Sequence, residues 1–219
     1  MDATSHSVEF LRETSRIAED LSAETIDRMA TGIADVRARG GRLFILGVGG
    51  GAGHASHAVN DFRKLCGIES YAPTDNVSEL TARTNDEGWD TTFESWLRTS
   101  RLSADDALLI FSVGGGSREH GISMNLVRAV DLATEVGAPV FAIVGKGDGV
   151  AAKAAGVAIV VPAPADRLTF HAEAFQAVIW HLLVCHPSLA RSPGKWESVA
   201  GSDGLAPAAR RGRSSTGTA

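Results

Sequence analysis

The segment from His54 to Asp61 contains two side chains whose spacing suits acid–base or metal chemistry. His57 and Asp61 are four residues apart, so they share one face if the segment is helical. An imidazole and a carboxylate in that arrangement can bind one divalent metal ion, or serve as a base beside the group that orients it. An exposed ion pair is the simpler interpretation of the pair alone. Its place directly after a glycine-rich turn favours a functional site.

Two glycine-rich segments, 47–53 and 112–117, each follow a short apolar run. A glycine turn lets backbone N–H groups approach an anion closely, and the N-terminus of a following helix favours negative charge. Ser112 and Ser117 add hydroxyl donors, so the second segment predicts a phosphate site. Neither a dinucleotide fingerprint nor a P-loop is complete, because no acidic residue ends a second strand at the expected distance and no GK[ST] follows. A tight turn without a ligand is the alternative.

A third set of polar side chains lies in the strongly apolar segment 169–185. Glu173 and His181 are eight residues apart, which corresponds to about 12 Å of helix rise and about 80° in projection. Polar groups on such a helix cost free energy unless they have partners. A buried, hydrogen-bonded imidazole is the alternative interpretation of His181. Thr74-Asp75-Asn76, in contrast, precedes a helical segment and is expected to cap it, so Asp75 is expected to serve in capping and not in catalysis.

The elements that must position these residues follow an alternating pattern. Short apolar runs at 42–47, 107–112, 139–145 and 157–162, with a weaker one at 68–72, are typical of strands buried on both faces of a parallel sheet. Helical segments are expected at 52–65, 77–98, 121–136, 148–155 and 169–185. The alternation predicts an α/β fold, a doubly wound parallel sheet of about five strands. Residues 6–39 predict one bent helix or two, with Ser22 as an N-cap.

Composition sets limits on the class of protein. The chain has 219 residues, of which 44% are hydrophobic and 21% charged, and this excludes wholesale disorder. A net charge of −5 argues against a role in coating nucleic acid. Cys66 and Cys185 are expected to be free thiols in a reducing compartment, the cytoplasm. No apolar run approaches the roughly 20 residues of a membrane span. The expected organisation is a helical segment at 1–40, one domain at 41–190 and a disordered tail at 202–219.

The motifs together resemble the sugar isomerase (SIS) domain family, and within it the sedoheptulose-7-phosphate isomerases. The resemblance covers about residues 8–187 and is carried by GVGGGAGHASHAVND, SVGGGS, the final WHLL and, most specifically, APTDNVSELTARTNDEGWDTTF. It implies a single SIS-type domain that converts a ketose 7-phosphate to an aldose 7-phosphate through an enediol. It also implies a divalent metal ion, zinc above all, and a homotetramer with sites at subunit contacts.

The resemblance also implies residue roles. Asp61 and His181 fall on the acid–base pair, and the metal ligands are His57, Asp61, Glu173 and His181. Substrate and phosphate contacts fall on Gly50, Gly51, Asp86, Ser112, Val113, Gly114, Ser117 and Glu173. The chain departs from the family at several of these positions. Asp61 stands where the family has glutamate, Glu173 stands where it has glutamine, and Val113, Gly114 and Gly116 replace mostly hydroxyl or amide side chains. These changes shift phosphate binding toward backbone amides. They also leave the identity of the sugar undetermined, and an octulose phosphate is one of the candidates.

Two other functions compete with the isomerase. One is a non-catalytic SIS module that binds a phosphosugar or a protein partner, and the other is a lyase or another phosphosugar transformation on the same scaffold. The presence of His57, Asp61 and His181 together favours the isomerase. The expected partner is therefore a phosphosugar, with no nucleic acid and no membrane.

Overall fold

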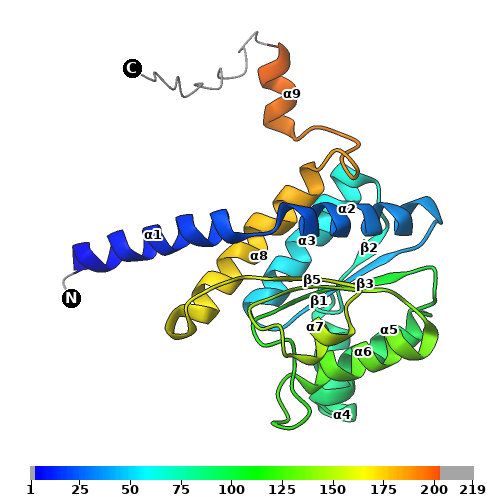
Figure 1. Ribbon diagram of the computed structural model, residues 1–219. Coiled ribbons are helices and arrows are strands. Elements are labelled where there is room, and N and C mark those ends of the chain that lie inside the picture. The colour runs from blue at the N-terminus through cyan, green and yellow to red at the C-terminus, as the bar shows by residue number, and fades with distance from the viewer. Residues whose placement is uncertain (1–2, 203–219) are drawn as a thin grey trace, which may run out of the picture.

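The protein, described here for residues 3–202 in a computed structural model, is built on a five-stranded parallel sheet (Figure 1). The strand order is β2-β1-β3-β4-β5. The strands are β1 (Leu43–Gly47), β2 (Ser70–Tyr71), β3 (Ala107–Ser112), β4 (Val140–Val144) and β5 (Val157–Val160). The predicted doubly wound α/β fold is confirmed, including the weak strand near 68–72. The tail expected to be disordered lies outside the described residues, apart from the last residue of α9 (Lys195–Ser202).

Helices cover both faces of the sheet because successive strand residues point to opposite sides. Leu43 and Ile45 join a core with α2 (Ala23–Ala38), α3 (Gly50–Cys66) and α8 (Leu168–Cys185). Phe44 and Leu46 join a second core with α5 (Thr92–Thr99), α6 (Met124–Val136) and α7 (Val150–Ala154). Burial on both faces explains why the strand sequences are apolar without alternation.

The N-terminal helical segment consists of two helices, α1 (Ala3–Asp20) and α2. Ser22 caps α2 as predicted, since its hydroxyl oxygen accepts a hydrogen bond from the Thr25 backbone N–H at 3.1 Å. Glu13 and Phe10 attach α1 to the first turns of α8. His171 Nε2 lies 2.9 Å from a Glu13 carboxylate oxygen, and the Phe10 and His171 rings stack at 4.3 Å between centroids.

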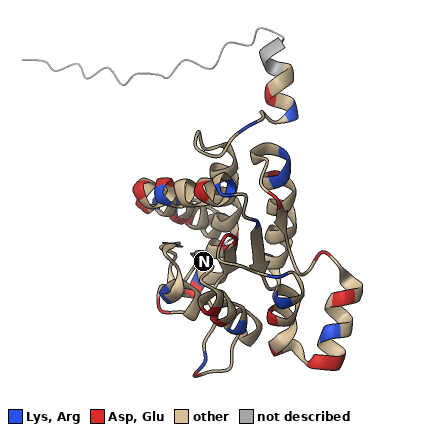
Figure 2. Ribbon diagram, turned by 90° about the vertical axis from the view of Figure 1, so that its right-hand side faces the viewer, with Lys and Arg blue, Asp and Glu red and all other residues tan. Residues whose placement is uncertain are grey.

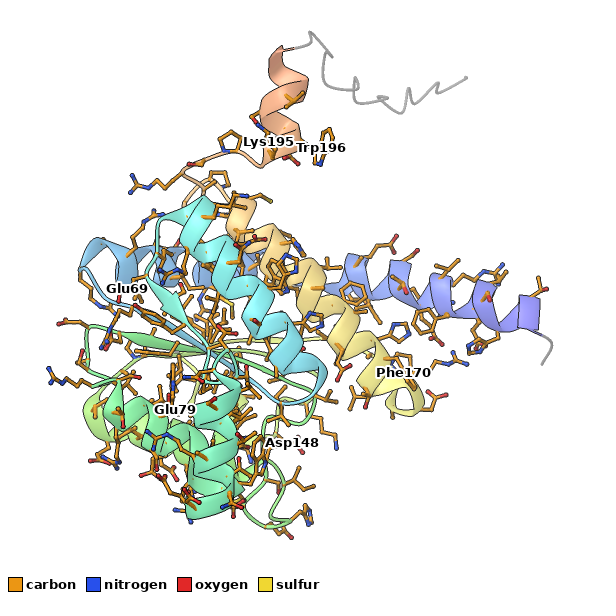
Figure 3. All side chains as sticks on the ribbon, turned by 180° about the vertical axis from the view of Figure 1, so that it is seen from behind. Glu69, Glu79, Asp148, Phe170, Lys195 and Trp196 are labelled. Atoms are coloured by element: carbon orange, nitrogen blue, oxygen red, sulfur yellow. The ribbon has the colours of Figure 1, made fainter. Side chains whose placement is uncertain are left out.

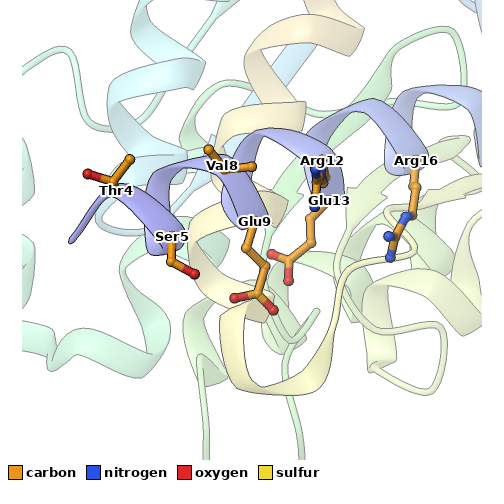
Figure 4. Close-up of a pocket in the computed structure, with 7 residues that line it drawn as sticks. All are labelled: Thr4, Ser5, Val8, Glu9, Arg12, Glu13 and Arg16. Carbon is orange, nitrogen blue, oxygen red and sulfur yellow. The ribbon is translucent and has the colours of Figure 1, made fainter. Parts of the chain in front are cut away.

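A hollow of about 500 Å³ runs along the side of α1 (Figure 4). Glu9 and Glu13 project from the helix in the same direction, and both form ion pairs with Arg167 at the start of α8. Arg167 belongs to the short helix η2 (Ala165–Arg167) that leads into α8. The N-terminal helix is therefore held to the domain by polar contacts at one end of α8.

The helix predicted at 77–98 is interrupted. It consists of α4 (Val77–Glu87), a short 3₁₀ turn η1 (Trp89–Thr91) and α5. Gly88 separates them with a φ of +88°, a backbone conformation that favours glycine and cannot continue a helix. The cap expected at Thr74-Asp75-Asn76 is confirmed in Asn76, whereas the expectation that Asp75 itself caps the helix is wrong. Asn76 is the N-cap and accepts from Ser78 and Glu79, while Asp75 accepts a 2.6 Å hydrogen bond from the Ser56 hydroxyl.

The segment Ala165–Cys185 has the length and composition of a membrane-spanning helix, which corrects the expectation that no segment does. Within the most apolar 18 residues of this segment, 44% is buried inside the structure. Its buried residues include Phe175, Ile179 and Leu183, which belong to the core beside α3. The apolar character of this helix is therefore used in packing within the domain.

Charges of both signs are interspersed along the outer helices (Figure 2). Several are paired with a neighbour of opposite sign, among them Arg98 with Glu94 and Glu135, and Arg118 with Asp131. Such exposed pairs contribute little to stability, but they offset the positive charge of these arginines locally.

Asp106 connects the start of β1 to the start of β3. Its carboxylate is 2% exposed and accepts hydrogen bonds from the backbone and guanidinium of Arg42 and from the backbone and hydroxyl of Ser103, all between 2.9 and 3.0 Å. Burial by itself raises the pKa of a carboxyl group. Here the hydrogen bonds outweigh burial, so the pKa of Asp106 lies below its usual value.

Asp106→Ala is expected to lower the free energy of unfolding by about 3 kcal/mol, because Arg42 and Ser103 lose a shared buried acceptor. Urea denaturation at pH 7 measures the difference. Since the pKa is depressed in the folded protein, this contribution is complete above the ordinary pKa of 3.8 and is lost as pH falls through the folded value. The difference in free energy of unfolding between the wild-type and Asp106→Ala proteins should therefore become smaller in acid. Asp105→Ala, which removes an exposed carboxylate next door, is the control, and an equal effect of both substitutions would contradict the argument.

Candidate functional site

The helices α3 and α8 lie side by side and run in the same direction (Figure 3). The contacts between them advance in step along both helices. Gly50 faces Glu173, His57 meets Trp180, and the Cys66 thiol lies 3.5 Å from the Val184 carbonyl oxygen. Polar residues that are more than 100 positions apart in the chain are therefore brought together turn by turn.

His57, Asp61 and His181 converge between these two helices. One ligand atom from each lies within 4.8 Å of the others, and His57 Nε2 is 3.9 Å from Asp61 Oδ2. His181 Nδ1 lies 2.7 Å from the Ala177 carbonyl oxygen. Because a carbonyl only accepts, Nδ1 carries the proton and Nε2 keeps its lone pair for a metal ion or a proton. Asn60 donates a 2.7 Å hydrogen bond to Asp61 Oδ1, which orients the carboxylate.

Trp180 forms the floor beneath the two imidazoles. Its buried ring stacks on His181 at 3.5 Å between centroids and meets His57 edge-on at 4.8 Å. A fixed aromatic surface restricts the rotamers of both histidines, so their nitrogen atoms are positioned in advance. Trp180 belongs to the WHLL motif, which is one of the motifs that carry the family resemblance. Its contact with His57 depends on the packing of α3 against α8.

The donor set fits a divalent metal ion such as zinc. Zinc binds imidazole nitrogen and carboxylate oxygen, and catalytic sites commonly use three protein ligands. Three of the four expected ligands, His57, Asp61 and His181, come together, and Glu173 is not part of that cluster. Two full turns of helix separate Glu173 from His181, so both reach one ion only if their side chains bend toward each other.

Glu173 lies instead at the N-terminal end of α3. A Cβ atom on Gly50 would be 2.5 Å from Glu173 Oε2, so glycine is what leaves room for the carboxylate. The partial positive charge of the helix N-terminus favours a carboxylate there. Burial lowers the pKa of neighbouring His54, and the charge and backbone of Glu173 oppose this shift only in part. A negative charge therefore stands at the end of the site where an anion is expected.

A hollow of about 220 Å³ opens at the carboxyl ends of β1 and β3, where ligands bind in open α/β sheets. Ser112 Oγ accepts a hydrogen bond from the Gly115 N–H at 3.0 Å, which leaves its own proton for a ligand. Gln176 Oε1 is buried without a hydrogen-bond partner, so it can accept from a ligand hydroxyl. The lining residues are Val48, Gly51, Ser112, Val113, Gly114, Ile122, Ser123, Glu173 and Gln176.

Ser117 does not line this hollow, contrary to the prediction. Ser117 and Ile122 form an antiparallel bridge with N···O distances of 2.9 and 3.0 Å, so residues 117–122 make an excursion from the loop. Ser117 borders a different hollow of about 540 Å³, together with Lys146 and Lys153. The predicted helix at 121–136 begins only at Met124, after this excursion.

Ser123 takes the position in the hollow that Ser117 was expected to hold. It precedes the first residue of α6, and its side chain forms no capping hydrogen bond, so the hydroxyl is available to a ligand. Its φ of +50° is left-handed, a conformation that costs a non-glycine residue about 1 kcal/mol or more. Ser123 directly precedes the apolar helical stretch that begins at Met124, and that position is the sequence signal that points to it.

Asp86 lies apart from both groups of residues. It is exposed on α4 and accepts a 2.7 Å hydrogen bond from Asn85. The partly buried Leu80 packs α4 against the core on the far face of the sheet from α3 and α8. Within one chain, the structure does not bring Asp86 to the hollow or to the histidines.

Comparison with known proteins decides the family. A family model described as the SIS domain matches residues 9–145, more than half of the chain. The chain belongs to the SIS domain family. The match ends before α8, so the contribution of His181 to this SIS domain rests on the geometry above.

Relatives of the chain include phosphoheptose isomerases and a lincomycin biosynthesis protein. A phosphoheptose isomerase of Chlorobium phaeobacteroides is 35% identical over 168 residues, 72% of this chain and 70% of that protein. The lincomycin biosynthesis protein LmbN of Streptomyces lincolnensis is 33% identical over 162 residues, 69% of this chain but only 57% of LmbN. The solved phosphoheptose isomerase GmhA from Neisseria gonorrhoeae superposes with a TM-score of 0.70 at 25% identity, covering 83% of this chain and 94% of that one.

Glu173→Gln is expected to tighten binding of inorganic phosphate about tenfold or more, because Glu173 lines the hollow and its carboxylate repels a bound anion. Calorimetric titration with phosphate at pH 8 measures the change. Glu119→Gln, on the exposed excursion at 117–122, is the matched control and should leave the affinity unchanged. Equal affinities of the wild-type and Glu173→Gln proteins would show that Glu173 does not face the anion.

Proposed function

We propose that this SIS domain is an aldose–ketose isomerase that acts on a ketose phosphate with the help of a divalent metal ion, zinc first. Sedoheptulose 7-phosphate or a close analogue such as an octulose 8-phosphate is the proposed substrate. The observation that carries the proposal is the convergence of His57, Asp61 and His181 on the same two helices whose N-terminal parts border the hollow at Ser112. The phosphoheptose isomerases among the relatives support the substrate class.

The proposed reaction moves a proton between two neighbouring carbons through an enediol. Removal of a proton next to a carbonyl needs a base within hydrogen-bond reach, and Asp61 and His181 Nε2 are the two candidates for moving it. Asp61 has a second carboxylate oxygen and could bind the ion and take the proton together, whereas Nε2 has one lone pair and would act as the base only when it does not hold the ion. Their orientation is fixed by Asn60 and by the Ala177 carbonyl, respectively. His57, Asp61 and His181 would hold a divalent ion, which would supply Lewis-acid stabilisation for negative charge on the sugar oxygens.

The phosphate group of the substrate is assigned to the hollow at the ends of β1 and β3. Ser112 and Ser123 supply hydroxyl protons, and the N-terminus of α6 favours an anion. Gln176 Oε1 is free to accept a hydrogen bond from a sugar hydroxyl. An anchor remote from the reacting carbons supplies binding energy and orients them toward the acid–base pair.

We further propose that the site is completed between copies of the chain in a homotetramer. Asp86 lies on the opposite face of the sheet, so its assigned contact with substrate requires a neighbouring copy. The exposed apolar side chains of Leu11, Phe170 and Val178, on α1 and α8, support an interface on this side of the molecule.

The proposed compartment is the cytoplasm. Cys66 and Cys185 are both free thiols in the structure, as a reducing compartment favours. Cys66 is buried and Cys185 exposed, so an oxidising compartment would leave one thiol open to unwanted pairing.

Asp61→Asn and His181→Ala are each expected to lower kcat for sedoheptulose 7-phosphate by about 10² to 10⁴, the usual contribution of a positioned acid or base. Metal analysis of the purified protein, with turnover measured before and after chelation, accompanies the kinetics. His186→Ala, which alters a histidine near the end of α8 outside the cluster, is the control. Undiminished turnover in both variants would refute the acid–base assignment. Phosphosugar binding without turnover in the wild-type protein would favour a non-catalytic SIS module.

Ser123→Ala is expected to raise KM for the phosphosugar about tenfold, because one hydrogen bond to a charged phosphate is lost. Ser117→Ala should change KM by less than about twofold, since Ser117 borders another hollow. Steady-state kinetics of the two single variants compares the serines directly. A larger increase in KM for Ser117→Ala than for Ser123→Ala would instead assign the phosphate contact to Ser117.

A further inference from the structure

A hollow of about 560 Å³ is lined by both members of the acid–base pair and by a segment of the chain that follows α8. Asp61 lines it from α3, His181 lines it from α8, and residues 190–194 belong to the later segment. We propose that Arg191 is a further substrate-binding residue, whose guanidinium donates hydrogen bonds to the sugar oxygen that becomes negatively charged during isomerisation. This inference rests on the proposed function and adds a residue at the reacting end of the sugar.

The backbone of Arg191 is attached to the C-terminal end of α3. The Leu65 carbonyl oxygen accepts hydrogen bonds from the backbone N–H groups of Arg191, at 2.8 Å, and of Ser192, at 3.1 Å. The guanidinium of Arg37 donates to both carbonyl oxygens of residues 188–189 and to the carbonyl oxygen of the last residue of α3, at 2.7 to 2.9 Å. The segment that carries Arg191 is therefore held in place on both sides of the end of α3.

This attachment brings the Arg191 side chain within reach of the acid–base pair. Leu65 lies one helical turn beyond Asp61 on the same face of α3. The rise over these four residues is about 6 Å, and an extended arginine side chain spans that distance. Arg191 and Asp61 line the same hollow, yet no ion pair joins them, so the cation and the carboxylate border that space without neutralising each other.

The guanidinium is available to a ligand. Within residues 3–202, the Arg191 side chain is exposed and has no hydrogen-bond or ion-pair partner. Arg191 is the only lysine or arginine among the described residues that line this hollow. The carboxylate of Glu197, which also lines it, is turned toward Gly194 in its own segment, since a Cβ on Gly194 would be 2.1 Å from Glu197 Oε2.

The proposed reaction creates the charge that Arg191 would bind. The base, Asp61 or His181, takes the proton from the carbon next to the carbonyl, the C–H electron pair forms the double bond of the enediol, and a carbonyl electron pair moves to the oxygen. A guanidinium suits that oxygen because it presents a fixed fork of N–H donors and keeps its charge at every working pH. The charge is greatest after proton removal, so the contribution of Arg191 belongs in kcat more than in KM.

Arg191 lies outside the part of the chain that the family comparison covers. The SIS domain model matches residues 9–145, and the sequence resemblance ends near residue 187. No role for Arg191 is therefore implied by membership of the family. The segment after α8 adds a cation to a site whose other residues lie on the helices of the domain.

Kinetics of Arg191→Ala tests the proposal. The variant is expected to lower kcat for sedoheptulose 7-phosphate about 10- to 100-fold, the usual effect of losing a hydrogen bond to a charged group, and to change KM by less than about twofold. Guanidinium chloride at concentrations far below denaturation should restore part of kcat in Arg191→Ala, because the free cation can occupy the vacated place. Lys64→Ala is the matched control, since it removes an exposed cation from the same turn of α3 that does not line the hollow.

A binding measurement tests the same contact without turnover. The probe is the hydroxamate of a six-carbon sugar acid 6-phosphate, whose planar anion resembles the enediolate of a seven-carbon sugar. Calorimetric titration is expected to show about 10- to 100-fold weaker binding of this probe to Arg191→Ala than to the wild-type protein. Binding of inorganic phosphate should be unchanged, because the phosphate group is assigned to the other hollow.

The outcomes separate this inference from the proposed function. Wild-type turnover together with equal affinity of the wild-type and Arg191→Ala proteins for the hydroxamate would overturn the role of Arg191 and leave the isomerase intact. A loss of kcat in Arg191→Ala that guanidinium does not restore, with phosphate binding weakened as well, would show a structural role for the segment and overturn the contact with substrate. A wild-type protein that neither binds the hydroxamate nor converts a ketose phosphate would overturn both proposals.

Discussion

The packing of α3 against α8 is the constraint on which the site depends. Each helix carries polar residues along one face, and neither alone presents a complete set of ligands. Glycine makes the approach of α3 to the sheet achievable. A Cβ on Gly47 would be 2.3 Å from the backbone of Gly51, and a Cβ on Gly51 would be 2.6 Å from the Phe111 carbonyl oxygen. The glycine run after β1 therefore fixes the path of α3, and through it the position of His57 and Asp61.

The same helix pair divides the site into two ends with different chemistry. At the N-terminal end, amides and the hydroxyls of Ser112 and Ser123 border a small hollow beside Glu173. About two turns further along α8, the imidazoles of His57 and His181 contact the ring of Trp180, and the Asp61 carboxylate lies beside them. Binding an anion at one end and transferring protons at the other is the division that a phosphosugar isomerase needs, because remote binding energy orients the reacting carbons.

Glu173 is the point at which this chain departs most from the chemistry implied by its family resemblance. A neutral amide at that position contacts metal or substrate without adding charge, whereas a carboxylate beside Gly50 competes with an anion for the N-terminus of α3.

The sequence by itself determined the fold and the local pairs. Strands that are apolar on both faces, glycine turns and helix caps such as Ser22 are each recognised from a few consecutive residues. For this reason β1 to β5 and the spacing of His57 and Asp61 could be predicted from the sequence pattern alone. Only the tertiary structure decided which distant residues meet. Glu173 and His181 lie on the same helix, but about two turns of helix separate them. Their neighbours on α3 therefore differ, since Glu173 lies beside Gly50 and His181 beside His57. Ser117 was displaced by a bridge to Ile122 that brought Ser123 into the hollow, and Asp86 was placed on the opposite face of the sheet. These outcomes depend on where one segment packs against another, and no periodicity within a single segment contains that information.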